Sequence, residues 1–308
     1  MGTPGFAVPT LQRLARHAGW TVTAAVCQPD RPVGRTQRRE APAVKRAAEE
    51  LGIAVYQPQR MRGAEAEAWL EGQRPDVLAV VAFGQILPKA VFERPRWGAI
   101  NAHASLLPAY RGAAPIQWAI AWGESQTGVT TMRINAGLDT GDMLLQRAIA
   151  IPPDATAPEL SAQLAELAAA LMQETLAGLE KDGVEGGLVA RPQPAVGSLA
   201  PMLTRADGQI EWRWKAAEIY NRWRGFQPWP GVHARFRGKQ LAIVRCRALS
   251  GESGGAPGLL MERDGGLCAQ TGAGWLALDQ VRLEGRQALG GMEFARGARL
   301  AWGSERLA

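Results

Sequence analysis

The residues best placed to do chemistry are Asn101 and His103, which lie two positions apart in the stretch NAHASLLP. If this stretch is a strand, the two side chains point to the same face, because side chains alternate along a strand. Near the carboxyl end of a parallel strand, that face opens on the crevice where ligands bind. An amide and an imidazole there can donate hydrogen bonds to a developing oxyanion, and the imidazole can also move a proton.

A carboxylate partner for His103 is expected from Asp139, which lies between Gly137 and Gly141 in the stretch NAGLDTGDML. A carboxylate beside the imidazole would favour the charged ring, which is the stronger stabiliser of an oxyanion. Taken alone, His103 fits a hydrogen-bonded structural residue at a strand end, and Asp139 fits a turn former. Taken together, Asn101, His103 and Asp139 predict a catalytic set.

The elements that would position these residues alternate between strand and helix along the first half of the chain. Runs of β-branched or wholly apolar residues predict strands, and amphipathic runs that end at glycine predict helices. Such alternation implies βαβ units, so we expect an α/β fold with an open, mostly parallel Rossmann-like sheet and helices on both faces. The expected strands are 20–27, 53–58, 75–84 and 143–151, together with a strand that runs into a loop within 98–108. The expected helices are 7–19, 43–52, 64–73 and 156–183.

The sequence starts on a loop, MGTP, whereas an open α/β domain normally starts with a strand that leads into its first glycine-containing loop. A sheet without that interior strand would leave unpaired backbone groups on its neighbours. We therefore expect the natural start to lie upstream, with a first strand that is missing here.

The composition changes in the last 40% of the chain. Residues 186–203 are rich in Gly and Pro and show no periodicity, which is typical of an extended linker. From residue 204 onward, short strands separated by glycine pairs predict a small OB-like β-barrel, a fold that binds oligonucleotides. The expected organisation is a catalytic domain at 1–185, a linker at 186–203 and a C-terminal domain at 204–308.

The distribution of charge points to an anionic partner. The chain carries a formal net charge of +6, and nucleic acid is the commonest partner of a basic protein. The strongest local signal is the stretch PDRPVGRTQRRE, where prolines and a glycine separate four arginines. A second basic region in the C-terminal domain is interleaved with tryptophans, which could stack on bases or belong to the core. These tryptophans are Trp212, Trp214, Trp223 and Trp229.

The cysteines and the hydropathy pattern predict the cellular compartment of the protein. Cys27, Cys246 and Cys268 match no metal-ligand or redox spacing, and three scattered thiols fit a reducing compartment such as the cytoplasm. No apolar run reaches the roughly 18 residues that a membrane span needs. A cytoplasmic protein without a bound metal and without membrane contact is therefore expected.

Motifs along essentially the whole chain resemble the folate-dependent formyltransferases. The resemblance is carried by NAHASLLPAYRGAAPIQWAI and GVTTMRINAGLDTGDML, whose spacing from Asn101 to Asp139 matches the catalytic set of that family. The stretches GTPGFAVPTL, QPDRPVGR, VVAFGQILP and GFQPWPG are similar to the branch that acts on charged initiator tRNA. One departure is Gly5, at a position where the family usually has an acidic residue.

This resemblance implies that a formyl group passes from 10-formyltetrahydrofolate to the α-amine of methionine on initiator tRNA. Asn101 and His103 would stabilise the tetrahedral oxyanion, and Asp139 would orient and charge the histidine. The implied folate site combines a turn at the end of a strand with a neighbouring apolar wall, and two of its four Leu and Ile residues are expected to be ordinary core. Its residues are Phe83, Gly84, Ile86, Leu87, Ser105, Leu106, Leu107 and Pro108.

The resemblance also implies a monomer with two basic surfaces that contact tRNA, and among their residues Arg35 is expected to contribute most. Two alternatives remain open. A formyltransferase of this kind could use a small amine, such as an amino sugar nucleotide, as its acceptor. The chain could also be a non-catalytic RNA-binding relative. The expected tRNA-binding residues are Arg31, Arg35, Arg38, Arg39, Arg235, Arg237 and Lys239.

Overall fold

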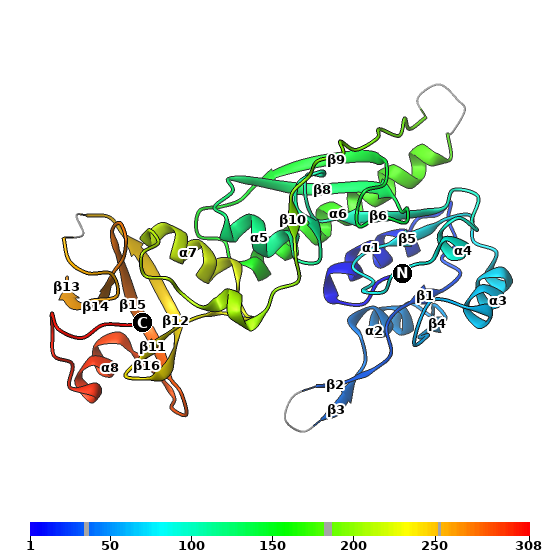
Figure 1. Cartoon of the computed structure of the whole chain (residues 1–308). Coiled ribbons are helices and arrows are strands. Elements are labelled where there is room, and N and C mark those ends of the chain that lie inside the picture. Colours follow the sequence, from blue (N-terminus) through cyan, green and yellow to red (C-terminus); the bar gives the residue numbers. More distant parts are fainter. Residues whose placement is uncertain (34–36, 182–186, 252–253) are drawn as a thin grey trace. The chain divides into compact units, whose positions relative to one another are not determined.

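The computed structural model describes residues 1–33, 37–181, 187–251 and 254–308 (Figure 1). These residues form two compact units. Unit 1 comprises residues 1–115, 126–150 and 160–201, and unit 2 comprises residues 116–125, 151–159 and 202–308. Residues 116–125 and 151–159 therefore belong to the same unit as the C-terminal residues, although they precede the linker in the sequence.

Unit 1 is built on a sheet with the strand order β5-β6-β8-β9, and a short pair, β1-β4, lies apart from it. The pairs β5-β6 and β1-β4 are parallel, whereas β8 and β9 are antiparallel additions. The strands are β1 (Ala25–Val26), β4 (Val55–Tyr56), β5 (Leu78–Val80), β6 (Ala99–His103), β8 (Gln126–Arg133) and β9 (Met143–Ala150).

The first residues of the chain connect the two parts of this sheet. The amide of Gly2 donates a hydrogen bond to the carbonyl of Val26 at 2.9 Å, and the carbonyl of Met1 accepts one from the amide of Val81 at 2.9 Å. Glycine is required at position 2, because a Cβ there would collide with the Ala7 side chain and the Val81 carbonyl.

Helices pack against this sheet through both apolar and polar contacts. Thr131 of β8 shares a buried hydrogen bond of 2.7 Å with Thr175 of α6, and Arg147 of β9 pairs with Glu174 of the same helix. Other elements of unit 1 include η1 (Gly5–Ala7), α1 (Val8–Ala15), α2 (Ala43–Glu50), α3 (Ala64–Gln73), α4 (Lys89–Phe92), β7 (Arg111–Gly112), β10 (Leu199–Ala200) and α6 (Ala157–Leu179). Helix α6 starts in unit 2.

The strand expected over residues 20–27 is much shorter than the sequence predicted. Only Ala25 and Val26 pair with a neighbouring strand. A cavity of about 480 Å³ borders the residues just before them and also the stretch that leads into β5. Apolar, β-branched residues thus predicted a strand over residues that border this cavity, and the ladder is confined to two residues on each side.

The arginine-rich stretch PDRPVGRTQRRE contains the two short strands of a hairpin. Strand β2 (Arg31–Val33) pairs antiparallel with β3 (Arg38–Glu40), and the hairpin extends away from the sheet of unit 1 (Figure 1). Its base is anchored at Asp30, which pairs with Lys45 at 3.0 Å and accepts a hydrogen bond from Gln57 at 2.8 Å. These two donors hold the pKa of Asp30 below its ordinary value.

Unit 2 contains an antiparallel sheet with the strand order β11-β12-β15-β14-β13, and β16 pairs with β15. The end of the chain hydrogen-bonds to both outer strands, because Arg235 and Ala308 exchange backbone hydrogen bonds and the amide of Leu260 donates to the carbonyl of Glu305. Its elements are α5 (Pro115–Ala121), η2 (Arg205–Gly208), α7 (Ala216–Gly225), β11 (Val232–Phe236), β12 (Lys239–Leu249), β13 (Leu260–Arg263), β14 (Gly266–Gln270), β15 (Trp275–Leu283), β16 (Ala288–Gly290) and α8 (Gly291–Ala298).

The predicted fold class is confirmed by this architecture. A partly parallel sheet with helices comes first in the chain, and a small antiparallel β unit follows it. The C-terminal strands pair as an antiparallel sheet whose two outer strands are connected through residues 305–308. Two elements, α5 and β8, were not singled out from the sequence, and β8 pairs directly with the strand that carries Asn101 and His103.

All three cysteines are buried as free thiols, and this gives a simple prediction. Burial raises the pKa of Cys27 to about 11 and also raises the pKa values of Cys246 and Cys268. Because the thiolate is the reactive form, we expect the folded protein to react slowly with Ellman's reagent at pH 8. The same three thiols should react rapidly in denaturant. Fast, stoichiometric labelling of the folded chain would contradict this expectation.

Candidate active site

Strand β6 places Asn101 and His103 inside the sheet of unit 1. Its neighbours are β5 on one side and β8 on the other, with Asn101 opposite Met132 and His103 opposite Thr130. The His103 side chain is 6% exposed, and Asn101 is half-buried. The expected strand and the shared face of the two side chains are therefore present.

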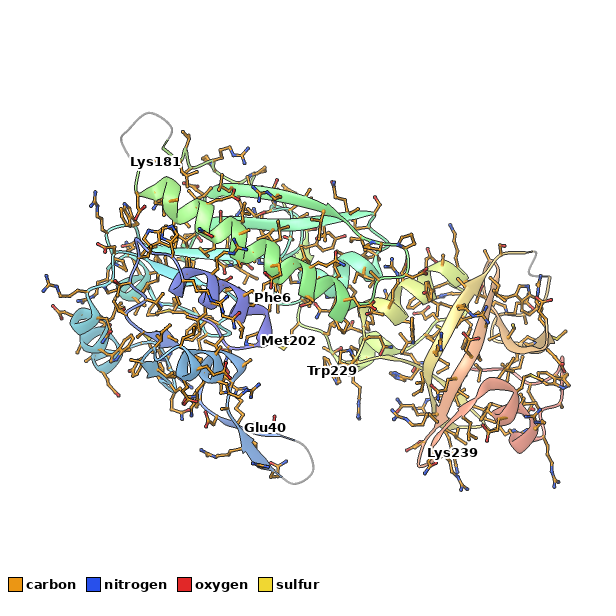
Figure 2. The ribbon with its side chains drawn as sticks, turned by 180° about the vertical axis from the view of Figure 1, so that it is seen from behind. Phe6, Glu40, Lys181, Met202, Trp229 and Lys239 are labelled. Atoms are coloured by element: carbon orange, nitrogen blue, oxygen red, sulfur yellow. The ribbon has the colours of Figure 1, made fainter. Side chains whose placement is uncertain are left out.

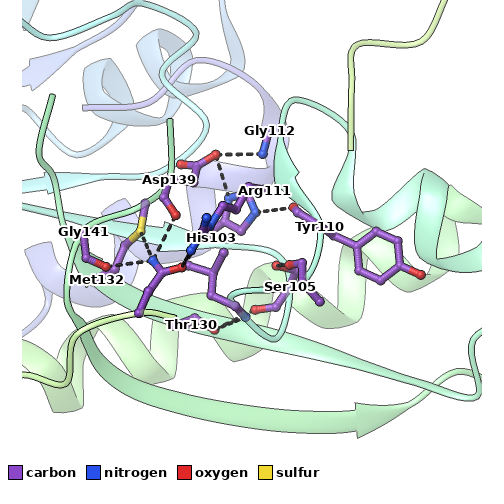
Figure 3. A network of polar contacts seen from close by, with 12 residues as sticks. His103, Ser105, Tyr110, Arg111, Gly112, Thr130, Met132, Asp139 and Gly141 are labelled. Atoms are coloured by element: carbon purple, nitrogen blue, oxygen red, sulfur yellow. Dashed lines mark hydrogen bonds and ion pairs between the residues drawn. The ribbon is translucent and has the colours of Figure 1, made fainter. Parts of the chain in front are cut away.

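The imidazole of His103 has an oxygen acceptor in front of each nitrogen. Nε2 lies 2.8 Å from the carbonyl oxygen of Tyr110, and Nδ1 lies 3.7 Å from Oδ2 of Asp139 (Figure 3). A carbonyl can only accept a hydrogen bond, so Nε2 must carry a proton. Nδ1 faces the carboxylate on the other side of the ring, so both ring nitrogens point at oxygen atoms.

Asp139 is held in place by its own loop and by the chain that follows β6. Its Oδ2 accepts a hydrogen bond of 2.9 Å from the amide of Gly112, and its backbone adopts a left-handed conformation with φ of 50°. The loop is closed further by Asn135, whose Oδ1 accepts hydrogen bonds from the Gly137 amide and the Thr140 hydroxyl. The structure thus brings Asp139 to His103, although 36 positions separate them in the sequence.

The carboxamide of Asn101 is available to a ligand. Within the part of the chain that the structure describes, no hydrogen bond is found for this side chain. Its amide nitrogen carries two N–H groups that can be donated to an oxygen. A half-buried donor that the protein itself does not use is suited to a substrate oxygen.

The turn that follows His103 is organised by two residues that sequence reasoning missed, Thr130 and Gln146. The hydroxyl of Thr130 donates to the carbonyl of Ser105 at 2.7 Å and accepts from the amide of Leu107 at 3.1 Å. Gln146 donates to the carbonyl of Leu107 and to the same hydroxyl, each at 2.9 Å. Both residues lie on the antiparallel strands β8 and β9, where other polar side chains also occur, so the sequence does not single them out.

The residues expected to bind folate divide into a buried and an exposed group. Phe83, Leu87, Ser105 and Leu107 are buried, and the Ser105 hydroxyl donates to the carbonyl of Ala109 at 2.6 Å. Ile86, in contrast, is 93% exposed. Gly84 is also exposed, and Leu106 and Pro108 are half-buried. The exposed group therefore contains the atoms that a ligand could touch.

Gly84 requires the freedom of glycine at this wall. Its φ is 76°, and a Cβ there would meet the amide of Gln28. That amide donates to the carbonyls of Phe83 and Gly84 at 3.1 and 2.9 Å. The Gln28 side chain thereby joins the wall to the chain just before the hairpin.

The arginines of the hairpin are presented to solvent. Arg31, Arg38 and Arg39 are all exposed, and Figure 2 shows the hairpin with Glu40 labelled at its second strand. Arg35 lies outside the described residues.

The basic surface of unit 2 is weaker than its composition suggests. Arg235 is exposed, as is Lys239 (Figure 2), whereas Arg237 pairs with Glu305, with 2.6 Å between Nε and Oε1. Arg224 is only 4% exposed and donates to the carbonyl of Ala155 at 3.1 Å. The side chains of Arg237 and Arg224 are therefore engaged in contacts within the protein.

Three of the four tryptophans in this region are committed to internal contacts. Trp212 is buried, Trp214 stacks with the guanidinium of Arg222 at 4.4 Å, and Trp223 donates to the carbonyl of Val244 at 3.2 Å. Trp229 is 54% exposed (Figure 2). Of these four tryptophans, Trp212 belongs to the hydrophobic core. Trp229 exposes the most surface on which a base could stack.

Two features are absent from the described ranges, a cluster of metal ligands and a membrane-spanning helix. No group of three or more His, Cys, Asp or Glu residues lies close enough to hold a metal ion. No helix there is both long and apolar enough to cross a membrane.

Comparison with known proteins identifies the family to which both parts of the chain belong. The family model described as "Formyl transferase" matches residues 1–176, and the model described as "Formyl transferase, C-terminal domain" matches residues 202–299. The methionyl-tRNA formyltransferase of Acidobacterium capsulatum is 50% identical over 302 residues, which cover 97% of this chain and 96% of that protein. The protein of the same name from Solibacter usitatus is 48% identical over 301 residues, covering 97% of this chain and 95% of that protein.

A solved structure shares the fold at low sequence identity. The sugar 3N-formyl transferase WlaRD superposes with a TM-score of 0.65 over 93% of this chain and 97% of that chain, at 16% identity. At this identity the likeness shows the fold and carries no information about the acceptor.

Proposed function

Because this chain belongs to the formyl transferase family, we propose that it transfers the formyl group of 10-formyltetrahydrofolate to the α-amine of methionine on charged initiator tRNA. The observation that carries the proposal is the position of His103, with Asp139 at one ring nitrogen and the Tyr110 carbonyl at the other. It supports oxyanion stabilisation, and the 50% identity to a methionyl-tRNA formyltransferase supports the choice of acceptor.

The reaction needs no covalent intermediate on the protein, because the neutral α-amine is itself a nucleophile. Its nitrogen forms a bond to the formyl carbon and gives a tetrahedral oxyanion, to which Asn101 and His103 donate hydrogen bonds. The bond from that carbon to N10 of the folate then breaks. The proton lost by the amine is balanced by the proton gained at N10, and in this proposal Asp139 relays it directly or through a water.

One contact has to change during this reaction. Nε2 of His103 is 2.8 Å from the Tyr110 carbonyl, so an oxyanion that uses this nitrogen must share the proton with that carbonyl or replace it. The amide of Tyr110 is held by the Ser198 hydroxyl at 2.8 Å, and its φ is 60°. The segment from Tyr110 to Gly112 is therefore the part of the site whose conformation matters most for access to the histidine.

The exposed apolar wall fits the folate co-substrate. A flat pterin ring needs an apolar surface and a few nearby polar groups. Ile86, Leu106 and Pro108 offer such a surface, and the chain bends tightly at Gly84 beside them. We therefore assign the exposed group to ligand contact, and the buried Phe83, Leu87, Ser105 and Leu107 to support of the wall.

The proposed division of labour along the chain is catalysis at 1–185, a connection at 186–203 and tRNA binding at 204–308, with the hairpin as a second RNA contact. We also propose that the protein acts as a monomer in the cytoplasm, away from membranes. Three buried free thiols support a reducing compartment.

A side-by-side assay tests the acceptor. The protein is incubated with 10-formyltetrahydrofolate and either methionylated initiator tRNA or a dTDP-linked amino sugar, and formylated product is measured. We expect product with the tRNA and at most a trace with the sugar. Product with the sugar alone would indicate a small-amine formyltransferase. No product with either acceptor would support a non-catalytic RNA-binding role.

Removing the hairpin charges is expected to weaken tRNA binding specifically. The double variant Arg38→Ala/Arg39→Ala should raise KM for charged tRNA about tenfold and leave kcat within about twofold. If both arginines contact phosphates, the slope of log KM against log salt should fall by about 1.5, since each lost contact removes roughly 0.7 to 0.9. Steady-state kinetics from 50 to 200 mM KCl measure both effects.

A matched variant separates local contact from loss of net charge. Arg16→Ala/Arg62→Ala removes two other exposed arginines of unit 1 and should leave KM and the salt slope nearly unchanged. Equal weakening by both double variants would contradict a specific role for the hairpin.

A further inference from the structure

A single side chain from the linker connects the two segments that hold the catalytic carboxylate. Oε1 of Gln193 accepts hydrogen bonds from Nε and NH2 of Arg111 at 3.1 and 2.8 Å. Its Nε2 donates to the carbonyls of Asp139 and Gly141 at 2.9 and 2.7 Å. Arg111, Asp139 and Gly141 therefore meet at one amide (Figure 3).

This amide uses its full hydrogen-bonding capacity. A glutamine has two N–H groups and two lone pairs on its carbonyl oxygen, and Gln193 finds a partner for all four. The orientation of the amide is also determined, because exchanging its oxygen and nitrogen would place donors against Arg111 and an acceptor against two carbonyls. The sulfur of Met132 lies 3.7 Å from the same nitrogen.

The two segments joined by Gln193 are the two that fix the carboxylate of Asp139. The first is the loop that contains Asp139 itself, which has a left-handed backbone that residues other than glycine rarely adopt. The second is the chain next to Arg111, where the amide of Gly112 donates to Oδ2 of Asp139 at 2.9 Å. A shift of either segment changes the 3.7 Å separation between Asp139 and His103.

The rest of the linker strengthens the same attachment. Strand β10 pairs in parallel with β7, and the amide of Arg111 donates to the carbonyl of Ser198 at 2.9 Å. Glycine is needed at position 112, because a Cβ there would collide with the carbonyl of Ala200. The linker thus lies against the site along several residues instead of serving only as a spacer.

From these contacts we propose that Gln193 is a positioning residue for formyl transfer, acting through the backbone of Asp139 and the side chain of Arg111. This inference rests on the proposed function. Gln193 touches no reacting atom, so its loss should affect the alignment of His103 and Asp139 more than the binding of either substrate. Misplacement by about 1 Å in a catalytic group can cost on the order of 100-fold in rate.

Two substitutions test the contribution of the hydrogen bonds made by the Gln193 amide. Gln193→Leu removes all four hydrogen bonds and should lower kcat about 10- to 100-fold, with both KM values within about twofold. Gln193→Glu keeps an acceptor for Arg111 but turns an acceptor toward the two carbonyls, and should also lower kcat. The control Gln173→Leu removes a glutamine of unit 1 that accepts from Arg13 at 3.2 Å and should leave kcat unchanged.

Hydrogen exchange provides a readout that does not depend on turnover. In Gln193→Leu, the peptides that contain Gly112 and residues 135–142 should exchange faster than in the unsubstituted protein, while the thermal midpoint changes little. An unchanged kcat together with unchanged exchange would overturn the inference, as would losses in kcat that follow a general loss of stability. If the unsubstituted protein makes no product, the proposed function fails, and local exchange alone decides the role of Gln193.

Discussion

Replacing His103 with alanine is expected to lower kcat by at least about 10²- to 10³-fold, the typical cost of one oxyanion donor. The variant loses the ring that lies between the Asp139 carboxylate and the Tyr110 carbonyl. Asn101→Ala should show a loss of similar size, because it removes the neighbouring free amide. Single-turnover formylation of charged tRNA, with protein in excess, measures the chemical step directly.

The controls for this prediction must exclude misfolding. His103 is buried, so its removal opens a small cavity and leaves the Tyr110 carbonyl without its partner. His103→Gln restores a donor for that carbonyl without an imidazole, and it should be as inactive as His103→Ala. His17→Ala changes a histidine that stacks on Trp20 elsewhere in unit 1 and should be fully active. Near-normal turnover of Asn101→Ala or His103→Gln would contradict the assigned roles.

The sequence predicted the local geometry of the site because that geometry depends on short-range rules. A two-residue spacing on a strand places Asn101 and His103 on one face, and the strand is present as β6. Flanking glycines and an aspartate predicted a turn around Asp139, and a turn is found there. The approach of Asp139 to His103 was a hypothesis from the residue types and the family resemblance, and the structure places their nearest polar atoms 3.7 Å apart.

Residues that act across the sheet were not predictable in the same way. Thr130, Gln146 and Gln193 each donate a hydrogen bond to a backbone carbonyl that lies 25 to 54 positions away in the sequence. From the sequence alone, a threonine in GVTTM is only a residue that favours strands. The register of β8 against β6 is what places Thr130 opposite His103. Gln193 lies in a Gly- and Pro-rich stretch whose composition predicts a spacer, and composition carries no information about tertiary contacts.

Charge was overestimated from the sequence for a related physical reason. Counting arginines in unit 2 predicts a basic surface, but Arg237 pairs with Glu305, which lies 68 positions away, and Arg224 is buried among carbonyl acceptors. Only exposed cations without a nearby carboxylate attract a phosphate at full strength. The hairpin, whose arginines are all exposed in its described part, is therefore the sharper prediction for RNA contact.

The other large effect is expected for Asp139→Asn, which should lower kcat on the order of 10²- to 10⁴-fold, as when the carboxylate that orients a catalytic histidine becomes an amide. The substitution preserves shape, and the new side-chain oxygen can still accept from the Gly112 amide. It removes the negative charge that faces Nδ1 of His103, so the ring loses the carboxylate that orients it.

The matched variant for this prediction is Asp76→Asn, which makes the same change at an exposed carboxylate of unit 1 and should have wild-type kcat. Asp139→Asn should bind charged tRNA and the folate donor about as tightly as the unsubstituted protein, because neither the hairpin nor the exposed wall is altered. A rise in either KM with an unchanged kcat would place Asp139 in substrate binding and remove it from the catalytic set. A loss confined to kcat, with the thermal midpoint preserved, is the result that links the carboxylate to the charge state and orientation of His103.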